Sequence, residues 1–265
     1  MVAFQALSYM APLAFCAWLL SLRKNDVSIV DSFWPLLILM GGATYALVSP
    51  QTGPRTTVVI TLLALWAARL AAHITWRHWN QPEDRRYQAI RARNQPHFRW
   101  KSLVLVFALQ SILAWVVSLS ILSAIMNTRP WNWLDILGAC LVVGGALFEA
   151  VADWQLARFK DAKGHHGQVM DQGLWRYSRH PNYFGEFCVW WGFYLLALSA
   201  QGWWAIASPV LMTVLLLRVS GVALQEKDIA ERRPGYIDYM ARTNTFFPGR
   251  QRQTTADKPE QPEAG

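Results

Sequence analysis

Long apolar stretches alternate with short polar segments along most of the chain. Stretches long enough to cross a bilayer as a helix, which takes about 20 residues, occur at seven places. They cover residues 4–22, 29–48, 56–76, 102–126, 131–152, 183–200 and 203–224. The pattern predicts an all-α, polytopic membrane protein, built as a bundle of about seven transmembrane helices in a single domain of residues 1–250.

Lysine and arginine residues gather at the same ends of these predicted helices. They follow the first, third and fifth apolar stretches and recur in the tail, whereas Arg55 and Arg129 are the cations of the opposite loops. Because cytoplasmic loops carry an excess of positive charge, we expect the N-terminus outside and the C-terminus in the cytoplasm. Residues 251–265, rich in Pro, Glu, Gln and Lys, are expected to be a disordered tail.

The composition agrees with a membrane protein and removes one class of partner. Of the 265 residues, 53% are hydrophobic and 16% are charged, below the roughly 25% charged residues of soluble domains. The net charge of +8 would suggest nucleic-acid binding in a soluble protein, but membrane topology alone produces such an excess. We therefore expect membrane lipids and no nucleic acid as partners. Neither a CxxC nor an HExxH spacing occurs, so a metal site is not expected.

The segment 171–199 places polar side chains just before and inside an apolar stretch. Arg176, Arg179, Asn182 and Glu186 lie close together in it. A loop that only sets orientation explains the arginines, but it explains neither Asn182 nor Glu186. The segment therefore predicts polar chemistry at a membrane surface.

Three other predicted helices carry ionisable groups. Asp31 opens the second helix, where it is either a functional carboxylate or a partner of the helix dipole. Arg69 and His73 lie one turn apart in the third helix, and Arg69 can pair with an acid such as Asp31 or reach a ligand. Glu149 and Asp153 lie one turn apart in the fifth, and such close carboxylates need a cation or donor nearby. The candidate cations are Arg176, Arg179 and Arg218.

Two further segments have an interfacial character. Residues 83–93 predict a short amphipathic helix on the lipid headgroups, with Tyr87 near its middle. The tail carries Tyr236, Tyr239 and Arg242, which are aromatic groups that can stack or donate beside a cation that can meet a phosphate or carboxylate.

Several of these motifs together resemble a known family. They are GLWRYSRHPNYFGE at residues 173–186, VDSFW at residues 30–34 and the Tyr236-x-x-Tyr239 pair. They are similar to the DUF1295 group of bacterial membrane proteins, which resembles the C-terminal domain of steroid 5α-reductases. The resemblance is best over residues 149–248, and it implies a multi-pass protein of the bacterial inner membrane.

The resemblance implies an NADPH-dependent reductase of an activated carbon–carbon double bond. Its substrate would be a lipophilic, steroid-like or isoprenoid-like enone drawn from the bilayer. NADPH needs several cations for its phosphates, balanced by acids and amides for the ribose and nicotinamide, and no G-x-G-x-x-G offers a Rossmann site. The cofactor-binding residues that the resemblance implies are Asp153, Lys160, Arg176, Arg179, Asn182, Tyr183, Glu186, Arg218, Tyr236, Tyr239 and Arg242.

Reduction of an enone also needs an acid that polarises the carbonyl. Steroid 5α-reductases use a Gln-Glu pair in the second helix and a Tyr in the third. This chain departs from that pattern, because it has Val30 and Asp31 in the second helix and Arg69 or His73 in the third. In place of that pattern, we expect Asp31, kept protonated by apolar surroundings, and Arg69 to be the catalytic residues.

A second enzyme class shares part of the pattern. The Arg179-His180-Pro181-x-Tyr183 sequence, followed by Glu226 and the tyrosine pair, is similar to isoprenylcysteine carboxyl and phospholipid methyltransferases. Those enzymes bind S-adenosylmethionine, whereas Asn182 and Asp31 favour the reductase. A scaffold or transporter is disfavoured, because the polar residues gather on one side and do not line a path across the bilayer.

Overall fold

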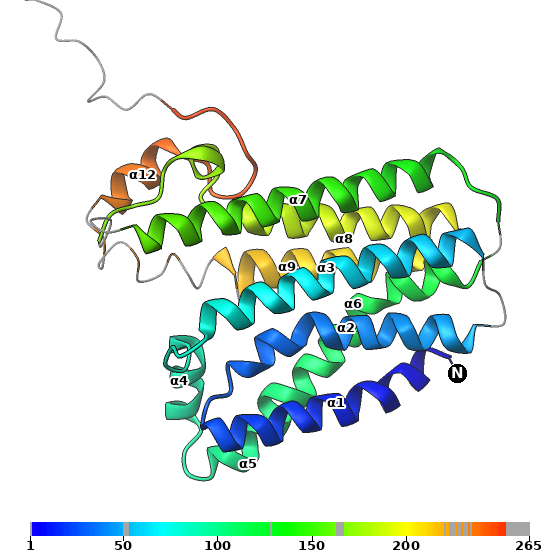
Figure 1. Cartoon of the computed structure of the whole chain (residues 1–265), viewed down its shortest axis with the longest axis horizontal. Helices are drawn as coiled ribbons and strands as arrows, with labels where there is room; N and C mark the ends of the chain where they lie inside the picture. The colour runs from blue at the N-terminus through cyan, green and yellow to red at the C-terminus, as the bar shows by residue number, and fades with distance from the viewer. Residues whose placement is uncertain are drawn as a thin grey trace, which may run out of the picture. The chain divides into compact units, whose positions relative to one another are not determined.

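The computed structural model describes residues 2–49, 53–127, 129–162, 167–219, 221–222, 226, 229, 233 and 235–252. This part of the chain is helical and contains no strand (Figure 1). The all-α prediction is therefore confirmed over the described ranges. Of the predicted disordered tail, residues 253–265 lie outside them.

Five helices are long and apolar enough to cross a membrane, and they match the first five predicted stretches. Four of them are α1 (Val2–Lys24), α2 (Ile29–Val48), α3 (Pro54–His78) and α7 (Trp133–Asp161). The fifth runs over Phe98–Ile125 and joins α5 (Phe98–Ser102), the π-helical segment η1 (Leu103–Ala108) and α6 (Leu109–Ile125).

The last two predicted stretches are also helical, but they are not among these five. One is α8 (Pro181–Ser199), whose first two turns contain polar side chains that lower its hydropathy. The other is a shorter apolar helix over Trp203–Val219. It consists of η3 (Trp203–Ile206), α9 (Ala207–Val214) and the π-helical η4 (Leu215–Val219). Between α3 and α5, the predicted amphipathic segment forms α4 (Arg85–Arg93).

The chain folds as two compact units. Unit 1 comprises residues 1–142 and 191–211, and unit 2 comprises residues 143–190 and 212–265. The division falls within α7 and within α8, so each of these helices contributes one part to each unit.

In unit 1, α2 packs against α1, α3 and α6 and forms the centre of the apolar core (Figure 1). Glycine permits the closest of these contacts, since a Cβ atom at Gly42 would lie 2.5 Å from Leu63 of α3. Polar side chains inside this core bond to one another, and the Tyr45 hydroxyl lies 2.9 Å from the Ser118 hydroxyl. The core of unit 1 is therefore tightly packed along the face that α2 presents to α3 and α6.

A buried ion pair closes one end of unit 1. Arg55, at the start of α3, is 4% exposed, and its guanidinium donates to both carboxylate oxygens of Asp135 at 2.7 and 3.0 Å. It also donates to the Ser199 hydroxyl at 3.3 Å. The remaining donors bond the backbone carbonyls of Asn127, Arg129 and Pro130. One side chain thus joins the beginning of α3, the loop before α7 and the end of α8.

We predict that Arg55→Met destabilises the protein, because it leaves the Asp135 carboxylate buried without its cation. Removal of one partner of a buried ion pair costs about 3–5 kcal/mol. The thermal unfolding midpoint of the purified protein in detergent measures this loss. Arg129→Gln changes an exposed arginine of the same loop and should leave the midpoint unchanged. Equal midpoints for Arg55→Met and the wild type would contradict the assignment.

In unit 2, the part of α7 that follows residue 142 packs against the first half of α8, with their backbones in contact. A Cβ atom at Gly145 would lie 2.7 Å from the Gly185 carbonyl oxygen, and one at Gly185 would lie 2.6 Å from the Glu149 nitrogen. Such close approach of helices is typical of small residues at membrane helix contacts. It brings the polar positions of both helices next to each other.

Candidate functional site

Acidic and amide side chains of α7 and α8 form a polar cluster at this close contact. Glu149 and Asp153 are 2% and 6% exposed, and Asn182 donates a hydrogen bond from its Nδ2 to Asp153 Oδ1 at 3.2 Å. Glu186 follows Asn182 by one turn of α8 and is half-buried. We call Glu149, Asp153, Asn182 and Glu186 the acid–amide cluster. Asp153 and Asn182, two of the expected cofactor-binding residues, therefore contact each other directly.

The segment before α8 is fastened to the end of α7. Gly173 has a φ of +58°, and a Cβ atom there would lie 2.6 Å from the Gln155 side chain. Gln155 accepts a hydrogen bond from the Leu174 backbone N–H at 2.9 Å, and the Trp175 indole donates to the Ala152 carbonyl at 3.0 Å. These contacts, together with Pro in the first turn of α8, determine where α8 begins and hence where Asn182 lies.

Arg179 has all its donors bound within the protein. The side chain is 7% exposed, and it donates to both carboxylate oxygens of Glu226 at 2.7 and 3.0 Å. Its remaining N–H groups bond the backbone oxygens of Met240 and Thr243 and the hydroxyl of Thr245. A direct bond from Arg179 to a cofactor phosphate would therefore require one of these bonds to break.

Glu226 collects further partners from the same motif. His180 Nε2 lies 3.0 Å from Glu226 Oε1. Burial alone would raise the pKa of the Glu226 carboxyl, but the hydrogen bonds from His180 and Arg179 outweigh it and lower this pKa from 4.5 to about 2. The pKa of Tyr236 is raised, first by burial and then by the negative charge of Glu226. Arg179, His180, Glu226 and Tyr236 thus form one ionic network, which we call the Glu226 network.

The tail residues also bind the motif segment. In α12 (Tyr236–Arg242), Tyr239 is 1% exposed, and its hydroxyl donates to the Trp175 carbonyl. Arg242 forms an ion pair with Asp171 at 2.6 Å, and both side chains are about one-third exposed. The tyrosine therefore holds the tail in place, whereas the arginine keeps partial access to solvent.

The remaining predicted cofactor residues are more accessible. Lys160, Arg176 and Arg218 are exposed cations, and Tyr183 is half-buried. The Tyr183 ring stacks on His180 with a centroid distance of 5.6 Å and an interplanar angle of 4°. All these residues belong to unit 2. Lys160, Arg176 and Arg218 are thus exposed, whereas Arg179 and Tyr239 are buried and bonded within the protein.

In unit 1, Asp31 accepts hydrogen bonds from two residues of α4. Arg86 Nη2 donates to Asp31 Oδ2 at 2.7 Å, and the Tyr87 hydroxyl donates to Asp31 Oδ1 at 2.5 Å. Asp84 caps α4 by accepting a bond from the Arg86 backbone N–H. The cation beside Asp31 is therefore Arg86 and not Arg69, which is half-buried on α3. The surroundings of Asp31 are polar, unlike the apolar ones that we expected.

Tyr87 is a candidate site residue that the sequence did not single out for catalysis. Its side chain is 5% exposed, and burial and the nearby Asp31 carboxylate raise its pKa well above 10.0. The hydroxyl therefore remains protonated at neutral pH. The 56-residue separation of Tyr87 from Asp31 hides the pair from sequence inspection, although the amphipathic helix that carries Tyr87 was predicted.

Comparison with known proteins identifies the family. Residues 17–243 match the family described as protein of unknown function DUF1295. The chain belongs to this family. The match begins in α1, so it extends well beyond residues 149–248, where we expected the best resemblance. The chain is also 25% identical over 271 residues to an uncharacterised protein of Schizosaccharomyces pombe. This alignment covers 87% of the present chain and 75% of the yeast protein. No solved structure matches this DUF1295 member.

We predict that the Glu226 network makes stability depend on pH. The folded-state pKa of Glu226 is depressed to about 2, so its stabilisation is present above pH 4.5 and is lost as the pH falls toward about 2. Glu226→Gln should lower the unfolding midpoint at neutral pH and reduce its change between pH 4.5 and 2. Thermal unfolding in detergent across this range measures both effects.

The matched control for this prediction is Asp238→Asn, which neutralises an exposed acid of α12. It should retain the wild-type pH dependence. If Glu226→Gln and the wild type lose the same stability between pH 4.5 and 2, Glu226 is not the group that causes the pH dependence.

Proposed function

We propose that this DUF1295 protein is an NADPH-dependent reductase of an activated C=C bond in a lipophilic, steroid-like or isoprenoid-like enone. The observation that carries the proposal is the hydrogen bond between Tyr87 and Asp31 at 2.5 Å. A protonated phenol can donate to a carbonyl oxygen that gains negative charge. Enone reduction requires such a donor, whereas transfer of a methyl group from S-adenosylmethionine does not require one.

The proposal includes a membrane arrangement. We infer that α8 and the Trp203–Val219 helix cross the bilayer in addition to the five long apolar helices, which gives seven spans. The N-terminus is then outside and the C-terminus in the cytoplasm of a bacterial inner membrane. The distribution of cations supports this orientation, and the substrate enters from the bilayer.

The residues of unit 2 suit a phosphorylated dinucleotide. Buried carboxylates and an amide, as in the acid–amide cluster, are suited to bind ribose hydroxyls and a carboxamide. The exposed cations Lys160, Arg176 and Arg218 are suited in charge to bind phosphates. When bound, NADPH supplies the hydride for the double bond. Arg179, Tyr236 and Tyr239 act indirectly in this proposal, because their polar groups bind the protein itself.

Asp31 and Tyr87 have complementary roles in the proposed reaction. In the free protein the single O–H of Tyr87 is donated to Asp31, which holds the hydroxyl in place. In the proposed reaction Tyr87 turns this O–H from Asp31 to the substrate carbonyl. Arg86, which pairs with Asp31 at 2.7 Å, keeps the carboxylate charge balanced while this happens. Arg69 on α3 remains a proposed catalytic residue beside this pair.

A methyltransferase that uses S-adenosylmethionine is the alternative. It draws on Arg179, His180, Glu226 and Tyr236, which resemble the methyltransferase motif. In this chain these four residues form the Glu226 network and bind one another. They therefore support the fold of unit 2 equally well in either enzyme class, and they do not favour the methyl donor.

We predict saturable binding of NADPH to the purified protein, with weaker binding of S-adenosylmethionine. Asn182→Ala should raise the dissociation constant for NADPH about ten-fold, because it removes a hydrogen-bonding amide, and Glu186→Ala should weaken binding in the same direction. Isothermal titration in detergent measures these constants. Gln172→Ala, an exposed amide in the same unit, is the control. Tighter binding of S-adenosylmethionine than of NADPH would contradict the proposal that the protein is a reductase.

We predict that Tyr87→Phe lowers kcat about 100- to 1,000-fold, the usual effect of removing one donor to a developing oxyanion. Asp31→Asn should also reduce turnover, and both variants should retain the wild-type affinity for NADPH. The rate of NADPH oxidation with a panel of lipophilic enones measures turnover. Tyr9→Phe changes an exposed tyrosine of unit 1 and controls for the substitution. Wild-type turnover by Tyr87→Phe would remove this residue from the mechanism.

A further inference from the structure

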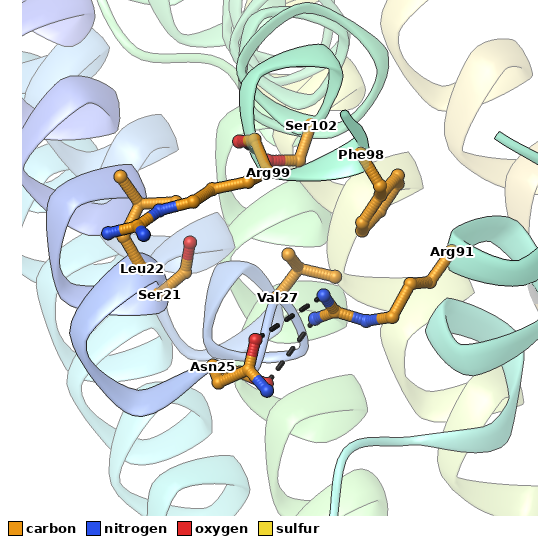
Figure 2. A pocket seen from close by; sticks show the side chains of 8 residues that line it. All are labelled: Ser21, Leu22, Asn25, Val27, Arg91, Phe98, Arg99 and Ser102. Atoms are coloured by element: carbon orange, nitrogen blue, oxygen red, sulfur yellow. Dashed lines mark hydrogen bonds between the residues drawn. The ribbon is translucent and has the colours of Figure 1, made fainter. Parts of the chain in front are cut away.

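A polar pocket of about 220 Å³ lies beside the end of α1. At about 30 Å³ for each water molecule, it has room for a headgroup-sized polar ligand. It is lined by Arg91 of α4, Arg99 of α5 and Ser21 of α1. Figure 2 shows Arg91 pointing to Asn25, and Arg99 extending toward Leu22 of α1. The pocket belongs to unit 1 and uses none of the residues assigned above to the reductase.

The guanidinium groups of the two arginines that line this pocket differ in their contacts within the protein. Arg91 pairs with Glu83 at 2.7 and 2.9 Å, and its Nη1 reaches Asn25 Oδ1 only at 3.5 Å. Arg99 is exposed, and its guanidinium makes no hydrogen bond or ion pair with another described residue. Since Glu83 balances Arg91, Arg99 supplies the net positive charge of the pocket. An anionic ligand is therefore favoured.

An apolar groove of about 710 Å³ runs along the same edge of α1. It is lined from α1 by Leu7, Ala11 and Phe15 and from η1 by Leu103 and Phe107. Its volume falls within the range of about 300–1,000 Å³ that ligand pockets occupy. Because α1 is one of the five helices able to cross a membrane, the groove suits an acyl chain.

Trp18 joins the pocket to the groove. Its indole donates to the Ser102 hydroxyl at 3.2 Å, and Ser102 lines the pocket. Its ring also lies 5.3 Å from Phe15, which lines the groove. Along α1, Ser21 in the pocket follows Phe15 by six residues, or about 9 Å of helix. This spacing is comparable with the headgroup layer of a bilayer, about 5–8 Å on each side.

We propose that the pocket and the groove together form a binding site for one anionic phospholipid. The phosphate lies against Arg99 and Arg91 Nη1, and an acyl chain follows α1 past Phe15 toward Leu7. Trp18, which is buried, packs between Phe15 of the groove and Ser102 of the pocket. The site is independent of the proposed reductase, so its failure would leave that proposal unchanged.

Native mass spectrometry of the full-length protein in detergent tests the site. Wild type is titrated with dioleoyl-phosphatidylglycerol and, separately, with dioleoyl-phosphatidylcholine, and the affinity of the first bound lipid is compared. We expect tighter binding of phosphatidylglycerol. Arg99→Gln should weaken it about five-fold, since one juxtamembrane cation contributes about 1 kcal/mol, with little effect on phosphatidylcholine. Arg99→Lys should preserve most of the preference.

Two matched pairs of variants separate the site from general effects. Arg93→Gln removes an exposed cation of α4 that does not line the pocket, and it should keep the wild-type affinity. Ala11→Phe fills the groove and should weaken both lipids, whereas Cys16→Phe changes an exposed residue of the same helix outside the groove and should not.

Several results would overturn the proposal. Equal affinity of the wild type for the two lipids would remove the role of charge. An equal loss for Arg93→Gln and Arg99→Gln would reduce the effect to general surface attraction. Full displacement of phosphatidylglycerol by inorganic phosphate would make free phosphate the ligand, and unchanged binding by Ala11→Phe would exclude the groove.

Discussion

An ion buried in an apolar helical bundle costs several kcal/mol unless a partner of opposite charge is close. This constraint accounts for the main polar contacts of the protein. Arg55 pairs with Asp135 and Arg179 with Glu226, and the partly exposed Arg86 and Asp31 also form a pair. The partners are 80, 47 and 55 residues apart in sequence, and each pair lies within one unit. The pairs therefore determine which distant segments meet inside each unit. They thereby also fix the positions of the other polar side chains on those segments.

The apolar pattern was sufficient to predict most of the fold. Five of the predicted stretches coincide with long apolar helices, and the amphipathic helix before α5 is present as well. The pattern could not show the division of α7 and α8 between two units, because this division depends on contacts between distant segments. The pattern also treated all seven stretches as equally apolar. In fact α8 is less apolar than the five long helices, because its first turns are polar.

The candidate site was predictable only where neighbouring turns carry the chemistry. Glu149, Asp153, Asn182 and Glu186 were recognised from one-turn spacings and from position beside an apolar stretch, and Asn182 does bond Asp153. The role of Arg179 was not predictable, because the sequence does not reveal that its partners come from Glu226 and the segment 240–245. Likewise, Asp31 was noticed, but Tyr87 gained importance only through the fold. Residue type thus predicted polarity, and long-range contacts decided which polar groups remain available.

An experimental structure determined with NADPH would test the central claim most directly, which is that unit 2 uses its acid–amide cluster and exposed cations while the Glu226 network stays intact. The account predicts nucleotide density against Asp153 and Asn182, with Arg179 still bound to Glu226. Density elsewhere, or a phosphate that takes Arg179 away from Glu226, would contradict it.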